Sequence, residues 1–173
     1  MIKMRNNKAA IKQVFTFLLV AILIGLIFLF AIKIIPNIIK QTCDADFVIF
    51  ADDLKSYIER YNTFGSTNIE SVLMPCEYTE ICFIDAEVIG EVMDIGNIEV
   101  AGSQEINPMI KESLIAGVEY NVFLLKGITA KPITFSQKLR VVGADYICIK
   151  NIAGKAKIKF VGQGKTTAIE AIV

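Results

Sequence analysis

The chain has 173 residues, with 18 basic and 18 acidic side chains, and it contains no histidine and no tryptophan. The absence of histidine excludes Ser-His-Asp and Cys-His nucleophile pairs and imidazole metal sites. The net charge of zero hides a strong asymmetry, because residues 1–40 carry six bases and no acid, whereas residues 41–173 carry 12 bases and all 18 acids. The later part is long enough to form one domain with its own core.

Residues 14–32 are free of charge, and fifteen of these nineteen positions are Leu, Ile, Val or Phe. As a helix they extend roughly 28 Å, which is close to the hydrocarbon thickness of a bilayer. Their transfer into lipid is favourable by roughly −5 to −9 kcal/mol. We therefore predict a transmembrane helix with a juxtamembrane extension, over residues 14–40. A buried core helix and a cleaved signal peptide are the alternatives, and residues 33–37 show no small-x-small cleavage motif.

The segment before this helix, residues 1–13, is short and basic, with Lys3, Arg5, Lys8 and Lys12. The positive-inside rule predicts that it stays in the cytoplasm and that residues 41–173 form an extracytoplasmic domain. The expected location is the cell membrane, with a single pass and the lipid bilayer as first partner.

Four cysteines lie on the predicted outer side: Cys43, Cys76, Cys82 and Cys148. An even number in an exported domain indicates two disulfides, and sequence alone leaves three connectivities open. We favour Cys76–Cys82 with Cys43–Cys148, and four buried thiols are the alternative. No Cys-x-x-Cys spacing supports a redox centre or a zinc site.

The predicted outer domain begins with helical periodicity. Apolar residues recur at three- and four-residue steps over residues 47–64, with Asp44 or Asp46 as a cap and Gly65 as a stop. Residues 69–74 and 80–88 then predict two strands that pair as a hairpin, followed by a short strand at 98–101. Asn107 and Pro108 open a second helix that runs to about residue 118.

The last third predicts strands over residues 121–125, 133–142, 146–150, 155–161 and 166–173, with turns at 151–154 and 162–164. The expected fold class is α+β: an N-terminal transmembrane helix followed by a small antiparallel β-rich domain with two helices, over residues 41–173.

Few residues suggest chemistry. Asp85 and Glu87 share a face of the predicted strand 80–88 and form the one candidate acid/base pair. Asp44, Asp46, Asp52 and Asp53 could approach a divalent cation, but helix capping and a solvated face explain them better. Gly162, Gly164 and Lys165 match only the end of a phosphate-binding loop, because residue 159 is Lys where that loop needs Gly. We expect no catalytic residue, cofactor, metal or nucleic-acid partner.

Charge is unevenly distributed within the outer domain. Residues 44–119 have a net charge of −13, and residues 120–173 have a net charge of +7. Either the two halves pack together and neutralise each other, or an acidic surface of one copy meets a basic surface of another. Self-association and binding to other membrane or surface proteins are therefore both open.

A short basic segment, an uninterrupted apolar helix, a proline near its outer end and a β-rich head resemble type IV pilins, including archaeal ones. In that family a dedicated peptidase cuts after a basic residue followed by a small one, and Lys8, Ala9 and Ala10 are similar. The resemblance implies processing there and a filament built from the helices. Pilins usually carry a glutamate shortly after the cut, whereas residues 11–15 hold no acid.

The chain also resembles uncharacterised single-pass membrane proteins of archaea, in residues 13–17, 75–85 and 121–124. That resemblance brings no activity with it. We expect a membrane-anchored extracytoplasmic protein with a structural or interaction role and no catalysis, and a pilin-like filament subunit is the alternative.

Overall fold

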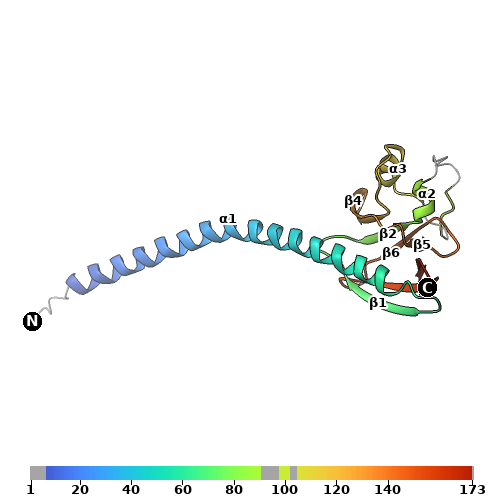
Figure 1. Ribbon diagram of the computed structural model, residues 1–173. Helices are drawn as coiled ribbons and strands as arrows, with labels where there is room; N and C mark the ends of the chain where they lie inside the picture. The colour runs from blue at the N-terminus through green and yellow to red at the C-terminus, as the bar shows by residue number, and fades with distance from the viewer. Residues whose placement is uncertain (1–6, 91–97, 102–104, 173) are drawn as a thin grey trace, which may run out of the picture. The chain divides into compact units, whose positions relative to one another are not determined.

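The computed structural model describes residues 7–90, 98–101 and 105–172. The chain divides into two compact units, Met1–Asp44 and Ala45–Val173. One helix, α1 (Asn7–Arg60), contributes to both (Figure 1). The described residues of the second unit add two four-stranded sheets and two shorter helices, α2 (Ala86–Gly90) and α3 (Pro108–Ile115). The predicted α+β class with an apolar N-terminal helix is confirmed.

Helix α1 corrects the prediction of two separate helices, because the backbone is helical from Asn7 to Arg60 without a break at Pro36. A proline removes one backbone hydrogen bond, and the isoleucine-rich residues on either side keep theirs, so one such loss does not end the helix. Asp44 and Asp46 consequently lie inside a helix, so neither marks a helix start. The helix ends at Arg60, before the predicted stop at Gly65, which adopts a left-handed φ of 78° in the following turn.

The eight strands of the described residues form two sheets. Sheet A has the order β1 (Thr67–Leu73), β7 (Lys155–Gly162), β8 (Thr167–Ala171) and β5 (Leu139–Val141). Sheet B has the order β4 (Thr129–Thr134), β3 (Val122–Lys126), β2 (Glu80–Ile84) and β6 (Tyr146–Lys150). All pairs are antiparallel except β5 with β8, which is parallel.

The first core lies between the inner face of sheet A, one face of sheet B and the last turns of α1. Alternation along β7 directs Ala156, Ile158 and Phe160 inward and its lysines outward, as the sequence predicts. From α1 the core takes Phe50, Leu54 and Ile58, which recur at four-residue steps on one helical face. We call this cluster the first core.

The second core lies on the opposite face of sheet B, beneath α3. It contains Ile110 and Leu114 of α3 together with Ile84, Phe123, Leu125, Tyr146, Cys82 and Cys148 of the strands. Because sheet B is buried on both faces, β2, β3 and β6 are continuous apolar runs rather than alternating ones. We call this cluster the second core.

The predicted hairpin of residues 69–74 with 80–88 is wrong. β1 pairs with β7 in sheet A, whereas β2 pairs with β3 and β6 in sheet B. The predicted strand 80–88 also ends at Ile84, since the Asp85 side chain accepts the N–H of Glu87 at 2.9 Å and begins α2. Around residues 98–101 the structure contains one bridge, from Val100 to Tyr146.

The predicted strand 133–142 divides into β4 of sheet B and β5 of sheet A. Asn121, fully buried, accepts the N–H of Ser136 at 2.9 Å and donates to its carbonyl at 2.8 Å. This pair of bonds satisfies the backbone at the point where the chain leaves one sheet for the other. The strands at 146–150 and 155–161 and the Asn107 helix start are confirmed.

Candidate functional site: the apolar helix, the disulfide and the surface of the second unit

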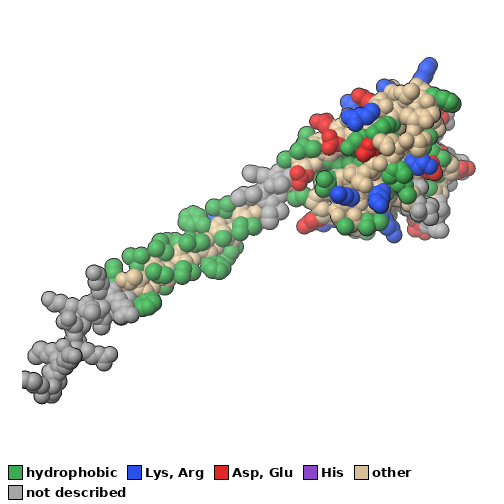
Figure 2. All heavy atoms as spheres, turned by 90° about the horizontal axis from the view of Figure 1, so that it is seen from below, with side chains coloured by type: hydrophobic (Ala, Val, Ile, Leu, Met, Phe, Trp, Pro, Cys, Tyr) green, Lys and Arg blue, Asp and Glu red, His purple; other side chains and the backbone are tan. Residues whose placement is uncertain are grey.

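The apolar part of α1 is long enough to cross a bilayer. Val14–Ile35 spans 22 residues with a mean hydropathy of 3.1, and none of its most apolar window is buried in the protein. Its leucine, isoleucine, valine and phenylalanine side chains are about half to two-thirds exposed. Figure 2 shows hydrophobic side chains along the visible face of this segment and most of the coloured charged side chains on the second unit. The first turns of α1 contain Lys8, Ala9 and Ala10, and processing there stays a prediction.

The cysteine pairing corrects our preferred connectivity. Cys82 of β2 is bonded to Cys148 of β6, directly opposite it in the antiparallel register. Cys76–Cys82 and Cys43–Cys148 are therefore both wrong. Cys43 and Cys76 are disulfide-bonded as well, and no described cysteine is free. The expectation of two disulfides agrees with this, whereas the alternative of four thiols does not.

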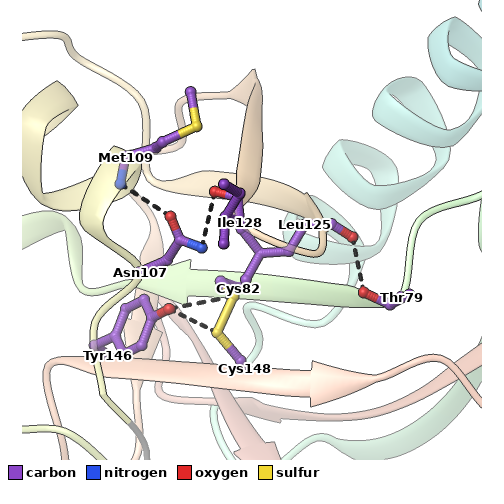
Figure 3. Close-up of a disulfide and its surroundings, with 8 residues drawn as sticks. All are labelled: Thr79, Cys82, Asn107, Met109, Leu125, Ile128, Tyr146 and Cys148. Atoms are coloured by element: carbon purple, nitrogen blue, oxygen red, sulfur yellow. Dashed lines mark hydrogen bonds between the residues drawn. A yellow bond between two sulfur atoms is a disulfide. The ribbon is translucent and has the colours of Figure 1, made fainter.

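Tyr146 covers the Cys82–Cys148 disulfide inside the second core (Figure 3). Its hydroxyl donates to Cys82 Sγ at 3.4 Å and lies 2.8 Å from Cys148 Sγ. Burial raises the pKa of the Tyr146 phenol to about 12, because the phenolate would lose its hydration in this apolar setting. Glu80 also approaches the two sulfurs, but disulfide sulfur is not a thiolate, so this group does not fit a metal.

Asn107 links α3 to the β3–β4 turn above the disulfide (Figure 3). Its side-chain oxygen accepts the N–H of Met109 at 3.0 Å and thereby caps the helix, as the sequence predicts. Its amide donates to the carbonyl of Ile128 at 3.3 Å. One side chain therefore fixes both the start of α3 and the position of the turn.

Asp85 and Glu87, the candidate acid/base pair, lie around the guanidinium of Arg140. Arg140 donates to Glu87 at 2.7 Å and lies 3.7 Å from an Asp85 oxygen. Asp85 also accepts the buried backbone N–H of Val141 at 3.0 Å. These contacts join α2 to β5, and they place both carboxylates against a single guanidinium.

The charge asymmetry within the second unit is partly resolved by packing. Lys126 pairs with Glu77, and Arg140 pairs with Asp85 and Glu87, so in both cases the base-rich half meets the acid-rich half. On the outer face of sheet A, Lys159 pairs with Glu170 at 2.8 Å. Exposed pairs contribute little stability, but they show that neutralisation inside one copy accounts for part of the pattern.

Two of the acidic residues of α1 line a groove, and a third does not. Asp46 and Asp53 line a groove of about 300 Å³ between α1 and the end of β1, and Asp52 is not among its lining residues. Ile49, Phe50 and Tyr57 of α1 and Ser71–Pro75 form the rest of the lining. Sequence reasoning missed this groove, since nothing local in the chain indicates that β1 lies beside α1.

Comparison with known protein families, curated proteins and solved structures gives no match for this chain.

Proposed function

We propose that this protein is a single-pass membrane-anchored protein whose outer domain has a structural or partner-binding role without catalysis. The observation that carries the proposal is Val14–Ile35, a 22-residue apolar helical segment with none of its most apolar window buried. Water would leave this surface unfavourably hydrated, and a bilayer would remove that cost. The same helix continues into the first core through Phe50 and Leu54, so anchor and domain are one covalent element.

The outward orientation rests on two independent features. Six bases and no acid in residues 1–40 favour a cytoplasmic N-terminus. Disulfide-bonded cysteines in the outer domain suit an oxidising compartment. The proposal of a non-catalytic role is supported by Asp85 and Glu87, whose carboxylates share Arg140.

Protease protection tests this proposal. Protease added outside intact cells should degrade residues 41–173 and spare the first dozen residues together with the span. A matched pair of variants sharpens the result. Leu23→Asp should lower the fraction of the chain that alkali-washed membranes retain, because a centrally placed Asp costs about 3 kcal/mol of the insertion energy. Leu23→Ala should be retained as the wild type is. Full protection of the domain would refute the outward placement.

A pilin-like subunit is the second candidate, and one observation favours it. A single helix, Asn7–Arg60, contains both the apolar segment and a stripe that packs on a β-rich domain, and the resemblance to pilins likewise rests on an apolar helix followed by a β-rich head. Mass spectrometry of the native protein separates the two. A start at Ala9 or Ala10, with filaments in the outer medium, would support the subunit, and an intact start at or near Met1 would refute it.

A further inference from the structure

The groove between α1 and β1 has a buried apolar floor and an exposed rim. Phe50, Val72 and Met74 on its floor are 3%, 5% and 6% exposed. Ile49 and Leu73 on its rim are 59% and 71% exposed, so apolar surface continues from the groove to solvent. A groove of this kind can take an apolar side chain from a partner.

The strand that borders the groove has a free edge. β1 is the outermost strand of sheet A, and within the described chain it pairs only with β7. The backbone of Ser66 and that of Met74 are hydrogen-bonded to the β7 hairpin, to Gly162 and Gly154. In an antiparallel pair, every second residue directs its N–H and C=O groups to the partner strand. The backbone groups of Ser71 and Leu73, at the alternate positions, therefore point away from β7. The N–H of Ile69 is already bonded to Asn68 Oδ1 at 3.0 Å. The open part of the edge is therefore the part beside the groove.

Two carboxylates mark the helical side of the groove. Asp46 and Asp53 are seven residues apart on α1, which places them about 10 Å apart along the helix on one face. Ile49 lies between them, and both carboxylates are exposed. The described residues supply no ion-pair partner for either. Along α1 the groove is therefore lined by a carboxylate, an apolar side chain and a second carboxylate.

We propose that this groove binds an extended, cationic segment of a partner protein, which adds to the free edge of β1. In such a strand, side chains at positions i, i+2 and i+4 share one face and span about 13 Å. Lys or Arg at the two ends can reach Asp46 and Asp53, and an apolar residue between them meets Ile49. A second copy joined β1 to β1 would bring two acidic rims together, so it fits this charge pattern poorly. The inference rests on the proposed partner-binding role.

A synthetic peptide tests the charge pattern. The probe is fluorescent acetyl-Thr-Lys-Thr-Val-Thr-Lys-Thr-amide, titrated with the full chain in lipid nanodiscs and followed by anisotropy. We expect saturable binding that each of Asp46→Asn and Asp53→Asn weakens about two- to fivefold, as for exposed ion pairs. Asp52→Asn is the matched control on the same helix and should leave the affinity within twofold. A peptide with Glu in place of Lys should not bind.

A second pair of variants tests the edge. Ser71→Pro removes an N–H from the free edge while leaving the β7 ladder intact, because proline is tolerated at edge positions of this kind. It should abolish binding, whereas Ser71→Ala, which keeps the N–H, should bind as the wild type does. Far-UV circular dichroism would check that both variants fold.

Three outcomes would overturn the inference: no binding of the lysine peptide, equal affinity in the Asp46→Asn/Asp53→Asn double variant, or equal affinity in the two Ser71 variants. Self-association of the wild type in nanodiscs that Ser71→Pro removes would make a second copy the occupant. The protease experiment stands apart from these, because it reports membrane placement whether or not the peptide binds. Failure of the docking site and failure of the anchored role therefore give different results.

Discussion

The two faces of sheet B are buried by different means. On one side, the first core is built from hydrocarbon and aromatic side chains of α1, sheet A and sheet B. On the other side, the smaller second core contains a disulfide, a buried phenol and a helix held by an asparagine cap. A short helix such as α3 can bury little apolar surface, so the second core depends on cross-linking and directed hydrogen bonds where the first depends on packing. The two cores should therefore respond to different perturbations.

Loss of the Cys82–Cys148 bond should have the largest effect. The two cysteines are 66 residues apart in sequence, and closing a loop of that length stabilises a protein by about 4 kcal/mol in the chain-entropy description. The Cys82→Ala/Cys148→Ala variant should lose about that much free energy of unfolding, measured by denaturant titration of the full chain in detergent. An unchanged midpoint would mean that packing alone maintains the second core.

Truncation in the first core should cost slightly less. Leu54 is fully buried, and Leu54→Ala should lower the free energy of unfolding by about 2–5 kcal/mol through lost transfer energy and the cavity left behind. Leu73→Ala, at a side chain 71% exposed, is the matched control and should change it by less than about 0.5 kcal/mol.

Leu54→Ala also tests whether the two cores contribute independently to the free energy of unfolding. Leu54 and the disulfide belong to separate clusters, so their effects should add to within about 0.5 kcal/mol when combined. A much larger deviation from additivity would show that sheet B transmits strain from one core to the other, and the two cores would then not be independent.

Alkaline pH should destabilise the second core through the titration of Tyr146. The pKa of Tyr146 is raised from 10.0 to about 12 in the folded protein, because its neutral form is favoured by burial. Below pH 10 the phenol is protonated in both states and contributes no pH dependence. Between pH 10 and 12 the unfolded chain binds fewer protons, so stability should fall by about 2–3 kcal/mol.

Tyr146→Phe provides the control, since it retains the ring in the second core without a titrating group. The difference in unfolding free energy between the wild type and this variant should shrink or reverse as the pH rises from 10 to 12. Equal slopes in the two proteins would show that other groups cause the alkaline loss.

The sequence predicted features that depend on neighbouring residues. The uncharged run at 14–32, the lysine alternation of β7 and the Asn107-Pro108 helix start each have a local physical cause, and each lies where it was expected. The apolar part of α1 was recognised for the same reason, because fifteen aliphatic or phenylalanine side chains in nineteen need no distant partner to be identified.

Features set by distant contacts were missed. The Cys82–Cys148 bond follows from the pairing of β2 with β6, and no local signal indicates that pairing. The wrong hairpin prediction arose because β1 and β2 are adjacent in sequence. In the structure β1 pairs with β7, and the apolar residues of β2 face both cores, as expected for a strand of sheet B. The Asp85–Arg140 contact and the α1–β1 groove are non-local in the same way.

The smallest expected effect concerns the cap of α3. Asn107→Ala removes both the bond from Met109 N–H and the bond to the Ile128 carbonyl, and it should cost about 1 kcal/mol of unfolding free energy. Asn107→Asp keeps the capping oxygen and loses only the amide donor, so it should recover most of that loss. Amide hydrogen exchange gives a finer measurement, because faster exchange should be confined to α3 and the β3–β4 turn. Faster exchange at Leu54 and its neighbours in α1 would instead mean that the cap supports both cores, since sheet B contributes residues to each of them.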